Sequence, residues 1–488
     1  MADFFSRNPL FSSSCSCAEK LSHHTAPVKF FPVVLACSAF FLGCNPVGPD
    51  HERPQTNLPA SFSRDGIQWK RTSAPKVYEN TRWWRVFGDS TLNDLAAATA
   101  SQNLSLQAAS ARLQEARALS RSSRTAVLPS LDFNGDVSRR KFIFGQGGNL
   151  QINNFSLPLD LSYEVDLWGK VRRQVESADA REASAKASFV ATQLTLTADT
   201  AQTYWALRAL DADRALLVSS IALRKESLAL VEARFRAGTV NALDVSRAQT
   251  EVANLEAELI GVDRNRAELV NSLAVLTGRN AGRLSIAAQA KLPKPPGIPA
   301  GFPADLLLRR PDLYAAERNV AAANAEIGVA KAAYYPNLRL QAGGGLAALD
   351  LGRLISADAT VWSLGSSLTY PILGQKKIRA DYDAAVARHQ AVSLDYKQSV
   401  LVALREVEDS LAGLDFLRRQ EEAQNNAVAA AQKSLDLSRK QYSAGLVSFS
   451  EVVDTERTLL STQRQVASLH SQRLAVTVNL IKALGGSW

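Results

Sequence analysis

Cysteine is absent from this chain after its first tenth. All four cysteines lie there, at Cys15, Cys17, Cys37 and Cys44. This distribution excludes a disulfide framework, a cysteine-ligated metal site and a buried cysteine nucleophile in the rest of the chain. The five histidines show no metal-ligand spacing, and no glycine-rich phosphate loop ending in Lys-Ser or Lys-Thr is present. We therefore predict a protein that is not an enzyme and that holds no metal and no cofactor.

Large blocks of one charge sign are also missing, although the formal net charge is +9. Lys and Arg are interleaved with Asp and Glu throughout the stretches of helical periodicity. This pattern is typical of solvated helix faces, whereas a nucleic-acid site gathers cations on one surface. We predict no nucleic-acid partner.

Long apolar runs are rare. One begins after Lys29 and extends from Phe30 to Leu42, which is too short for an ordinary transmembrane helix. Together with the small residue before Cys44, it indicates a secretory signal peptide over residues 1–43. Cleavage before Cys44 would leave it as the only cysteine of the mature chain, at the N-terminus, where bacterial lipoproteins are acylated. Two lipobox positions depart from the usual residues, and Cys37 remains a competing site.

What the sequence does contain is an internal repeat. An Ala-Gly turn lies between two long helical patterns in Arg234–Val245, and Gln441–Val452 repeats it. Gly238 and Gly445, the glycines of the two turns, are 207 residues apart. The same offset relates three other pairs, which are Pro129 and Pro336, Tyr163 and Tyr370, and Gly278 and Gly485. A register held over half the chain predicts one fold with a two-fold internal repeat. The predicted division is a signal peptide (1–43), a lipidated N-terminal arm (44–90), a first repeat (91–278), an inter-repeat linker (279–304) and a second repeat (305–485).

Long helices are predicted in both repeats, because small or apolar residues recur there at three-and-four spacing. Their expected ranges are 91–127, 171–236, 242–276, 311–333, 378–443 and 450–484. Asp89 or Ser90 is expected to cap the first helix, and Pro129 to end it. At 1.5 Å rise per residue, the longest helices measure on the order of 100 Å, about three bilayer thicknesses. They are also too charged to lie in a membrane and must project into an aqueous compartment.

Strands are predicted where the periodicity changes to two. Residues 155–167 alternate between apolar and polar, and residues 131–137 alternate in the same sense. A basic, glycine-rich loop is expected between them, over 139–153. In the second half, strands are expected to begin at 338 and to cover 362–372. Each half therefore supplies one strand pair.

Four strands are too few to close a membrane barrel, since the smallest have about eight. An open sheet edge leaves N–H and C=O groups unpaired, which a bilayer does not tolerate. If these strands span a membrane, the chain must oligomerise, and a trimer would supply twelve strands. The polar faces would then line a wet lumen, while Phe155, Tyr163, Trp362 and Tyr370 would face lipid or its interfaces. The alternative is a small soluble four-stranded sheet attached to long coiled coils.

Several motifs resemble those of the outer-membrane factor family, the TolC-like channels, and most closely its lipoprotein branch that serves resistance-nodulation-division (RND) drug pumps. The matching stretches are Cys44–Pro54, Trp84–Asp89 with Leu92 and Leu95, Asn103-Leu104 with Ala108, Ala111–Leu113 and Ala116, Ser162–Arg172, Leu308–Asp312 with Ala316-Glu317, and the two Ala-Gly turns. They cover essentially the whole mature chain in the family's order. His51 departs from the family, which usually has an aromatic residue there.

The resemblance implies an α+β membrane protein of the outer membrane. Three copies would form a twelve-stranded transmembrane β-barrel, four strands per chain, continuing into a long α-helical coiled-coil barrel with a mixed equatorial domain. The homotrimer would be lipid-anchored through Cys44 and would project into the periplasm. Its implied partners are a periplasmic adaptor (membrane fusion) protein and an inner-membrane RND-type pump.

The resemblance also assigns the two turns and the residues after the second. Ala237-Gly238-Thr239 and Ala444-Gly445-Leu446 would contact the adaptor, although the glycines are equally compatible with merely ending helices. Glu451 and Asp454 share one helix face and match the family's acidic periplasmic aperture; helix N-terminal charge is the alternative. Their first-repeat equivalents are Asp244 and Arg247, and we expect Arg247 to restrain the closed state by pairing with a carboxylate of the second turn. Ser450 stands where relatives often carry a bulkier apolar gate residue.

The function implied is a passive exit duct for drugs or other small amphiphiles. A duct for type I protein secretion or metal efflux and a non-conducting envelope scaffold lipoprotein remain as alternatives.

Overall fold

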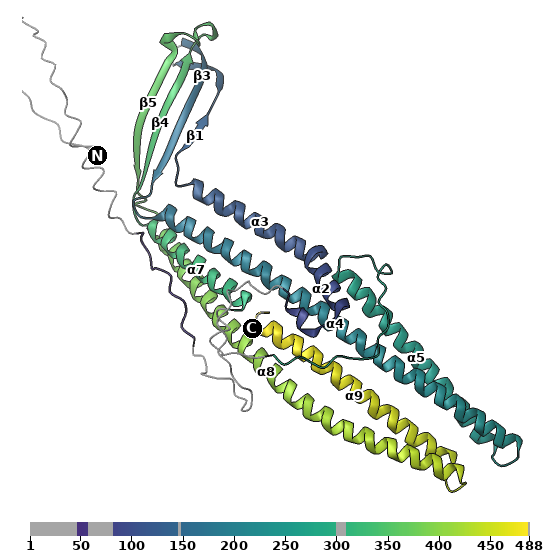
Figure 1. Cartoon of the computed structure of the whole chain (residues 1–488). Helices are drawn as coiled ribbons and strands as arrows, with labels where there is room; N and C mark the ends of the chain where they lie inside the picture. The colour runs from purple at the N-terminus through teal and green to yellow at the C-terminus, as the bar shows by residue number, and fades with distance from the viewer. Residues whose placement is uncertain (1–45, 57–81, 145–147, 299–308, 487–488) are drawn as a thin grey trace, which may run out of the picture. The chain divides into compact units, whose positions relative to one another are not determined.

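The computed structural model describes residues 46–56, 82–144, 148–298 and 309–486 (Figure 1). The predicted signal peptide, Cys37 and Cys44 lie outside the described residues. The chain divides into two units, Met1–Asn45 and Pro46–Trp488, and everything below concerns the second.

Helices make up most of the described chain. They are the short 3-10 helix η1 (Trp83–Phe87) and the α-helices α2 (Ser90–Gln102), α3 (Leu104–Thr125), α4 (Lys170–Arg236), α5 (Ala242–Leu276), α7 (Pro311–Ala332), α8 (Gln375–Ser443) and α9 (Phe449–Ala483). Five of the six predicted helices are confirmed, with ends within three residues of those expected.

The first predicted helix is wrong in one respect, because it is interrupted at Asn103. This residue has extended backbone, and its Oδ1 accepts from the Leu106 N–H at 3.0 Å, which caps α3. Its Nδ2 donates to the Leu276 carbonyl at 2.8 Å, at the end of α5. These two side-chain hydrogen bonds stabilise the break more than a continuous helix would be stabilised at this position. Asp89 caps α2 as predicted, accepting from the Leu92 N–H at 2.9 Å.

The strands form one antiparallel sheet in the order β1, β3, β4, β5, with β2 also on β3. They are β1 (Ser130–Phe133), β2 (Asp136–Phe144), β3 (Gly148–Val165), β4 (Asn337–Ala348) and β5 (Thr360–Thr369), and the short helices η3 (Leu351–Arg353) and η4 (Ala357–Ala359) lie between the last two. The predicted loop over 139–153 is wrong, since β2 and β3 pair as far as Phe144 and Gly148. Ladder hydrogen bonds join main-chain groups, so polar side chains do not prevent them.

A proline divides β1 from β2. Phe133 opposes Leu159 and Asp136 opposes Ser156, so the register is continuous across the gap. Pro158 lies opposite the gap; its carbonyl accepts from the Asn134 N–H at 3.1 Å, but it has no N–H to donate in return. The two strands are therefore one interrupted strand, and each half supplies two strand lengths, as predicted.

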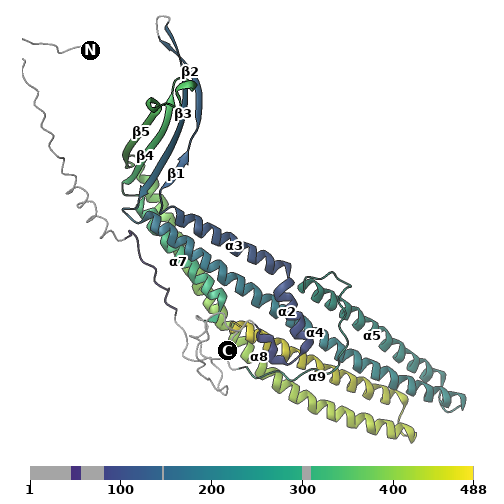
Figure 2. The ribbon, with the colours of Figure 1, turned by 45° about the horizontal axis from the view of Figure 1, so that its top comes forward.

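The long helices lie side by side (Figure 2). α4 lies along α5, α7 and α9, and α8 lies along α7 and α9. A buried aromatic cluster lies where η1 and α2 meet α4, formed by Trp83, Trp84, Phe87, Tyr204 and Trp205. Helix ends from both halves of the chain contribute to this core, including Leu273 of α5 and Ile481 of α9.

The described part of the N-terminal arm is extended and packs on other elements, as predicted. The Val47 N–H donates to the Trp168 carbonyl at 2.9 Å, and Arg173 binds Asp50 at 2.8 Å. Gly48 has φ +106°, and a Cβ there would lie 2.6 Å from the Gly328 Cα. Two glycines thus permit a close approach between the arm and α7.

Candidate functional site

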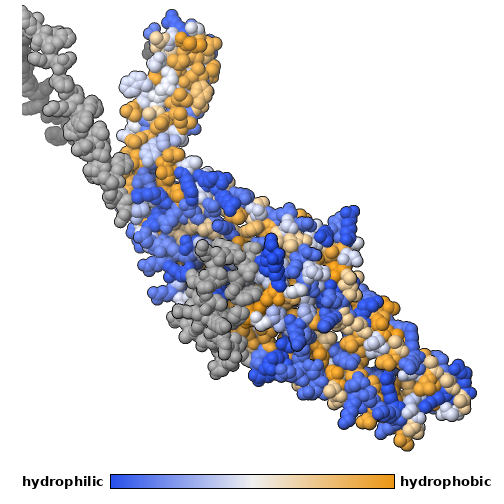
Figure 3. Space-filling model, viewed as in Figure 1, coloured by the Kyte–Doolittle hydropathy of each residue, from blue (hydrophilic) through white to orange (hydrophobic). Residues whose placement is uncertain are grey.

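The sheet has one apolar face, and that face is uncovered. Leu157, Leu159 and Leu161 of β3 share it with the alternate residues of β4 and β5 that oppose them. On β5, Trp362 is 82% exposed and Leu364 is 79% exposed. Figure 3 shows the hydrophobic surface that covers the strands. In water, such a surface is a strong indication of a partner or a membrane.

The three predicted lipid-facing aromatic residues within the sheet lie on this apolar face. The register places Phe155, Tyr163 and Trp362 there, while Tyr370 follows the end of β5. The opposite face carries polar residues, among them Asp160, Ser162, Glu164, Arg339, Gln341, Ser363 and Ser367. The sheet is therefore amphipathic.

Both edges of the sheet are open among the described residues. β1 and β2 pair only with β3, and β5 pairs only with β4. Such edges present unpaired N–H and C=O groups. On a long, apolar edge strand these groups pair readily with a strand of another chain. The sheet is thus built to be continued.

The two Ala-Gly turns end long helices in the same way. Gly238 and Gly445 have φ of +73° and +74°. After α4, the Thr239 N–H donates to the Arg234 carbonyl at 3.0 Å; after α8, the Leu446 N–H donates to the Gln441 carbonyl at 2.9 Å. A left-handed glycine with such a bond is a standard helix ending. The six predicted contact residues Ala237, Gly238, Thr239, Ala444, Gly445 and Leu446 are all exposed.

An apolar cluster joins the two hairpins just behind these turns. The rings of Tyr442 and Phe449 are in contact at 5.7 Å between centroids, tilted by 54°, and Val231 of α4 packs in the same cluster. The Arg234 guanidinium lies over the Tyr442 ring, 4.5 Å from its centroid. The turns are therefore held close to each other from behind.

The predicted aperture residues lie at the beginnings of α5 and α9. Glu451 and Asp454 are exposed on α9, and Ser450 hydrogen-bonds Ser448 at 2.7 Å. Asp244 lies in the first turn of α5, where its N–H is capped by the Asn241 side chain at 3.0 Å.

Arg247 is exposed, and the described part of this chain offers it no ion-pair partner. Asp454 instead approaches Arg457 at 3.8 Å. The expected pairing of Arg247 with a carboxylate of the second turn does not occur within one chain; between copies it stays a prediction.

Sequence reasoning missed a charged node that ties the two hairpins together. Glu251 of α5 is 9% exposed and binds Arg224 of α4 and Arg457 of α9. A second contact joins the Arg457 Nε to the Glu251 carboxylate at 3.1 Å. Glu456 of α9 binds Arg439 of α8 at 2.7 Å and lies 3.8 Å from Arg224. Four helices are thus joined by five charged groups.

A signal for the node was present in the sequence. Glu251 shares the buried face of α5 with Ala248, Val252 and Leu255, so it lies in the apolar stripe of that helix. A carboxylate on such a stripe needs a cationic partner. Burial raises the pKa of Glu251, but the hydrogen bond from Arg457 and the charge of Arg224 outweigh it, so the net shift is downward.

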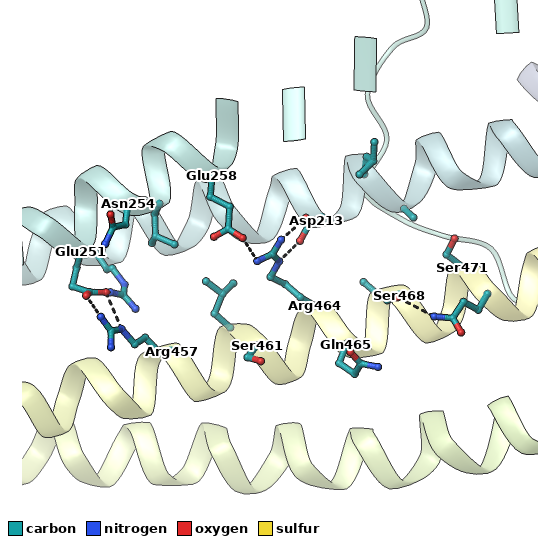
Figure 4. A pocket seen from close by; sticks show the side chains of 17 residues that line it. Asp213, Glu251, Asn254, Glu258, Arg457, Ser461, Arg464, Gln465, Ser468 and Ser471 are labelled. Atoms are coloured by element: carbon teal, nitrogen blue, oxygen red, sulfur yellow. Dashed lines mark hydrogen bonds and ion pairs between the residues drawn. The ribbon is translucent and has the colours of Figure 1, made fainter. Parts of the chain in front are cut away.

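A charged cleft of about 690 Å³ lies beside the node, between α4, α5 and α9. In Figure 4, Arg464 reaches from α9 toward Asp213 and Glu258, and it bonds Asp213 at 2.9 Å. Hydrogen bonds and the charges of these carboxylates raise the pKa of Arg464. The arginines of the cleft wall, Arg224, Arg457 and Arg464, are therefore paired with its carboxylates.

Two kinds of site are absent from the described residues. No group of three or more His, Cys, Asp and Glu side chains there is placed to hold a metal ion. None of the described helices is both long enough and apolar enough to cross a membrane.

The fold defines the class of protein. The solved structure of the outer-membrane channel OprN matches with a TM-score of 0.83 and 29% identity, covering 91% of this chain and 99% of OprN. The fold is that of the TolC-like outer membrane channels.

The chain belongs to the outer membrane efflux protein family, whose model matches residues 95–279 and 302–486. The solvent efflux pump outer membrane protein SrpC of Pseudomonas putida is 32% identical over 475 residues, which is 94% of this chain and 99% of SrpC. The cation efflux system protein CusC of Escherichia coli is 29% identical over 467 residues, with 95% and 99% covered. Members of this family are outer membrane transport conduits rather than enzymes.

Proposed function

We propose that this protein is the exit duct of a tripartite efflux system, formed when three copies join their sheets into a twelve-stranded barrel. The observation that carries the proposal is the open, amphipathic sheet. Its apolar face on β3 extends from Phe155 to Val165. The ten steps between these residues, at about 3.3 Å each and tilted by about 40°, span about 25 Å. That is the height of the apolar band of outer-membrane barrels.

The helices then form the periplasmic part of the duct. The equivalent hydrogen bonds at Gly238 and Gly445, 207 residues apart, support an internal two-fold repeat in which α4 with α5 and α8 with α9 are equivalent hairpins. Three copies would place six such hairpins in a helical barrel. Its exposed turns would contact a periplasmic adaptor, which connects the duct to an inner-membrane RND-type pump.

A lipid on Cys44 would anchor the trimer to the outer membrane. The described part of the arm begins at Pro46, and the Val47 N–H donates to the Trp168 carbonyl at 2.9 Å. Palmitate labelling tests the assignment: Cys44→Ala should abolish it and Cys37→Ala should not. Label retained in Cys44→Ala would refute it.

The aperture would be acidic. Glu451 and Asp454 are three residues apart at the exposed beginning of α9, so a trimer carries two rings of three carboxylates near its end. Crowded carboxylates favour cations. We further propose that Arg247 restrains the closed state by pairing with such a carboxylate of a neighbouring copy. Arg247→Glu should raise single-channel conductance in planar bilayers, and an unchanged conductance would contradict this role.

The cargo proposed is a small amphiphile. SrpC is a solvent efflux protein, and another relative, OpmQ of Pseudomonas aeruginosa, exports pyoverdine. Metal-ion efflux is the second candidate, which the similarity to CusC supports. Both cargoes need the same duct, and the pump partner would select between them.

The test compares cells with and without this chain. Deletion should raise the accumulation of a fluorescent hydrophobic amphiphile in energised cells, and a plasmid copy should restore it. If accumulation is unchanged and sensitivity to toxic metal cations rises instead, metal efflux is the function. If neither changes and the purified protein does not conduct, the duct proposal fails in favour of a scaffold.

A further inference from the structure

The hairpin of β2 and β3 changes polarity near its end. On the apolar face, the outermost apolar pair is Val137 opposite Phe155. The next pair on that same face is Arg139 opposite Asn153, and Lys141 opposite Gln151 follows. The alternation of apolar and polar residues thus inverts between one pair and the next, at the end of the sheet away from the helices (Figure 2).

The opposite face becomes more apolar at the same level. Asp136 and Ser138 are followed there by Arg140 opposite Ile152 and then by Phe142 opposite Leu150, while Ile143 lies on the first face beyond Lys141. A strand pair that stayed in hydrocarbon would keep its apolar side chains on one face. The change in polarity after Val137 therefore marks the level at which the hairpin leaves the apolar band.

The two cations on the outer face are arranged for a ligand outside the chain. Arg139 and Lys141 are both exposed. The Arg139 guanidinium donates to the Gln151 Oε1 at 2.7 Å, which leaves its other N–H groups available in a fixed orientation. Beyond Val137, the described residues of this face include no carboxylate that could neutralise them; the neighbouring Asp136 lies on the other face, bonded by Asn154 and Ser138.

Their height matches the lipid headgroups. Arg139 and Lys141 lie two and four residues beyond Val137, which is about 5 and 10 Å above the rim of the apolar band for strands tilted by about 40°. The headgroup region is about 5 to 8 Å thick on each side of a bilayer. Both side chains are long enough to end inside it.

We propose that Arg139 and Lys141, supported by Gln151, form a binding site for the phosphate groups of anionic lipid in the outer leaflet. Arginine binds phosphate through paired N–H donors, and lysine adds a point charge. Three copies place three such sites around the barrel. The site holds the barrel at a defined depth, with its apolar band against hydrocarbon. The inference rests on the proposed membrane barrel.

The experiment measures lipid binding to the purified oligomer by native mass spectrometry. The probes are bisphosphorylated lipid A, its dephosphorylated form and inorganic phosphate. The variants are Arg139→Gln, the double variant Arg139→Gln/Lys141→Gln, and Arg140→Gln, which makes the same charge change on the opposite face. Each cation near a lipid surface contributes about fivefold in affinity, so the double variant should bind bisphosphorylated lipid A about 25-fold more weakly.

Arg140→Gln should weaken binding by less than about twofold, since its side chain faces the lumen side. The dephosphorylated lipid should bind wild type and double variant alike, and inorganic phosphate alone should form no comparable adduct. Equal losses in Arg140→Gln and Arg139→Gln would overturn the site, as would equal binding of both lipid forms or an equal adduct with free phosphate. If the wild-type protein inserts into membranes and conducts but shows no preference for phosphorylated lipid, only this inference is refuted. If the wild-type protein does not insert at all, the barrel itself is refuted.

Discussion

The node around Glu251 should control how firmly the two hairpins are joined. Glu251→Gln keeps the shape of the side chain but leaves Arg224, whose side chain is 5% exposed, without its closest anion. Removing one partner of a buried ion pair costs about 3 to 5 kcal/mol. Two features reduce this cost: Arg457 is 57% exposed, and Glu456 remains 3.8 Å from Arg224. We expect about 2 kcal/mol, which corresponds to a factor of about 30 in a local opening equilibrium.

Hydrogen–deuterium exchange of the oligomer in detergent measures this effect directly. Backbone amides of α5 around Glu251 should exchange about 30-fold faster in Glu251→Gln than in wild type at pH 7, because local opening becomes easier. Glu258→Gln is the matched control, since it also removes a carboxylate from an arginine on α9, but from a pair whose side chains are 31% and 42% exposed. It should change exchange by less than about threefold.

The pH dependence provides the sharper criterion. The pKa of Glu251 is lowered in the folded protein. The stabilisation from the node is therefore fully present above the pKa of Glu in the unfolded chain, about 4.3, and is lost as the pH falls through the lower pKa of the folded protein. The difference between wild type and Glu251→Gln should therefore be full at pH 7 and shrink below about pH 4. A difference below threefold at pH 7, or one that does not change with pH, would refute the reasoning.

Three further predictions concern other parts of the chain. Gly328→Ala should displace the N-terminal arm, because the added Cβ would lie 2.8 Å from the Val47 carbonyl oxygen; limited proteolysis should cut the arm several-fold faster, and an unchanged rate would contradict the contact. Leu364→Arg on the apolar face should cost about 2 to 4 kcal/mol per chain near the bilayer midplane and reduce the oligomer recovered from outer membranes. The control Ser363→Arg, on the opposite face, should leave recovery nearly unchanged, and equal losses would show that the faces are assigned wrongly. Asp454→Asn should reduce cation preference, measured as the reversal potential under a salt gradient, and an unaltered potential would remove Asp454 from the aperture.

Local pattern was sufficient for most of the fold. The C-terminal ends of α4, α5, α8 and α9 follow from left-handed glycines and uninterrupted helical periodicity, which are properties of short stretches of chain. The amphipathic part of β3 follows from an alternation that is visible without any partner strand. The repeat was visible for the same reason, since equal spacing is carried by the sequence itself.

Pairing partners were harder to predict. The distal half of β2 and β3 looked like a loop because the segment is basic and glycine-rich, but its main chain pairs as far as Phe144 and Gly148. The interruption at Asn103 depends on the Leu276 carbonyl, which lies far away in sequence.

The candidate site divides in the same way. The sequence by itself determined the exposed turns, the apolar sheet face and the acidic residues at the beginning of α9, because each is a run of neighbouring residues whose chemistry is independent of context. Only the tertiary structure decided that Glu251 lies between Arg224 and Arg457, and that Arg139 and Lys141 continue the face of Val137. An ion pair between helices and a shared face of a sheet depend on which segments pack together. That packing is decided by the burial of the whole apolar surface, which no single stretch of sequence contains.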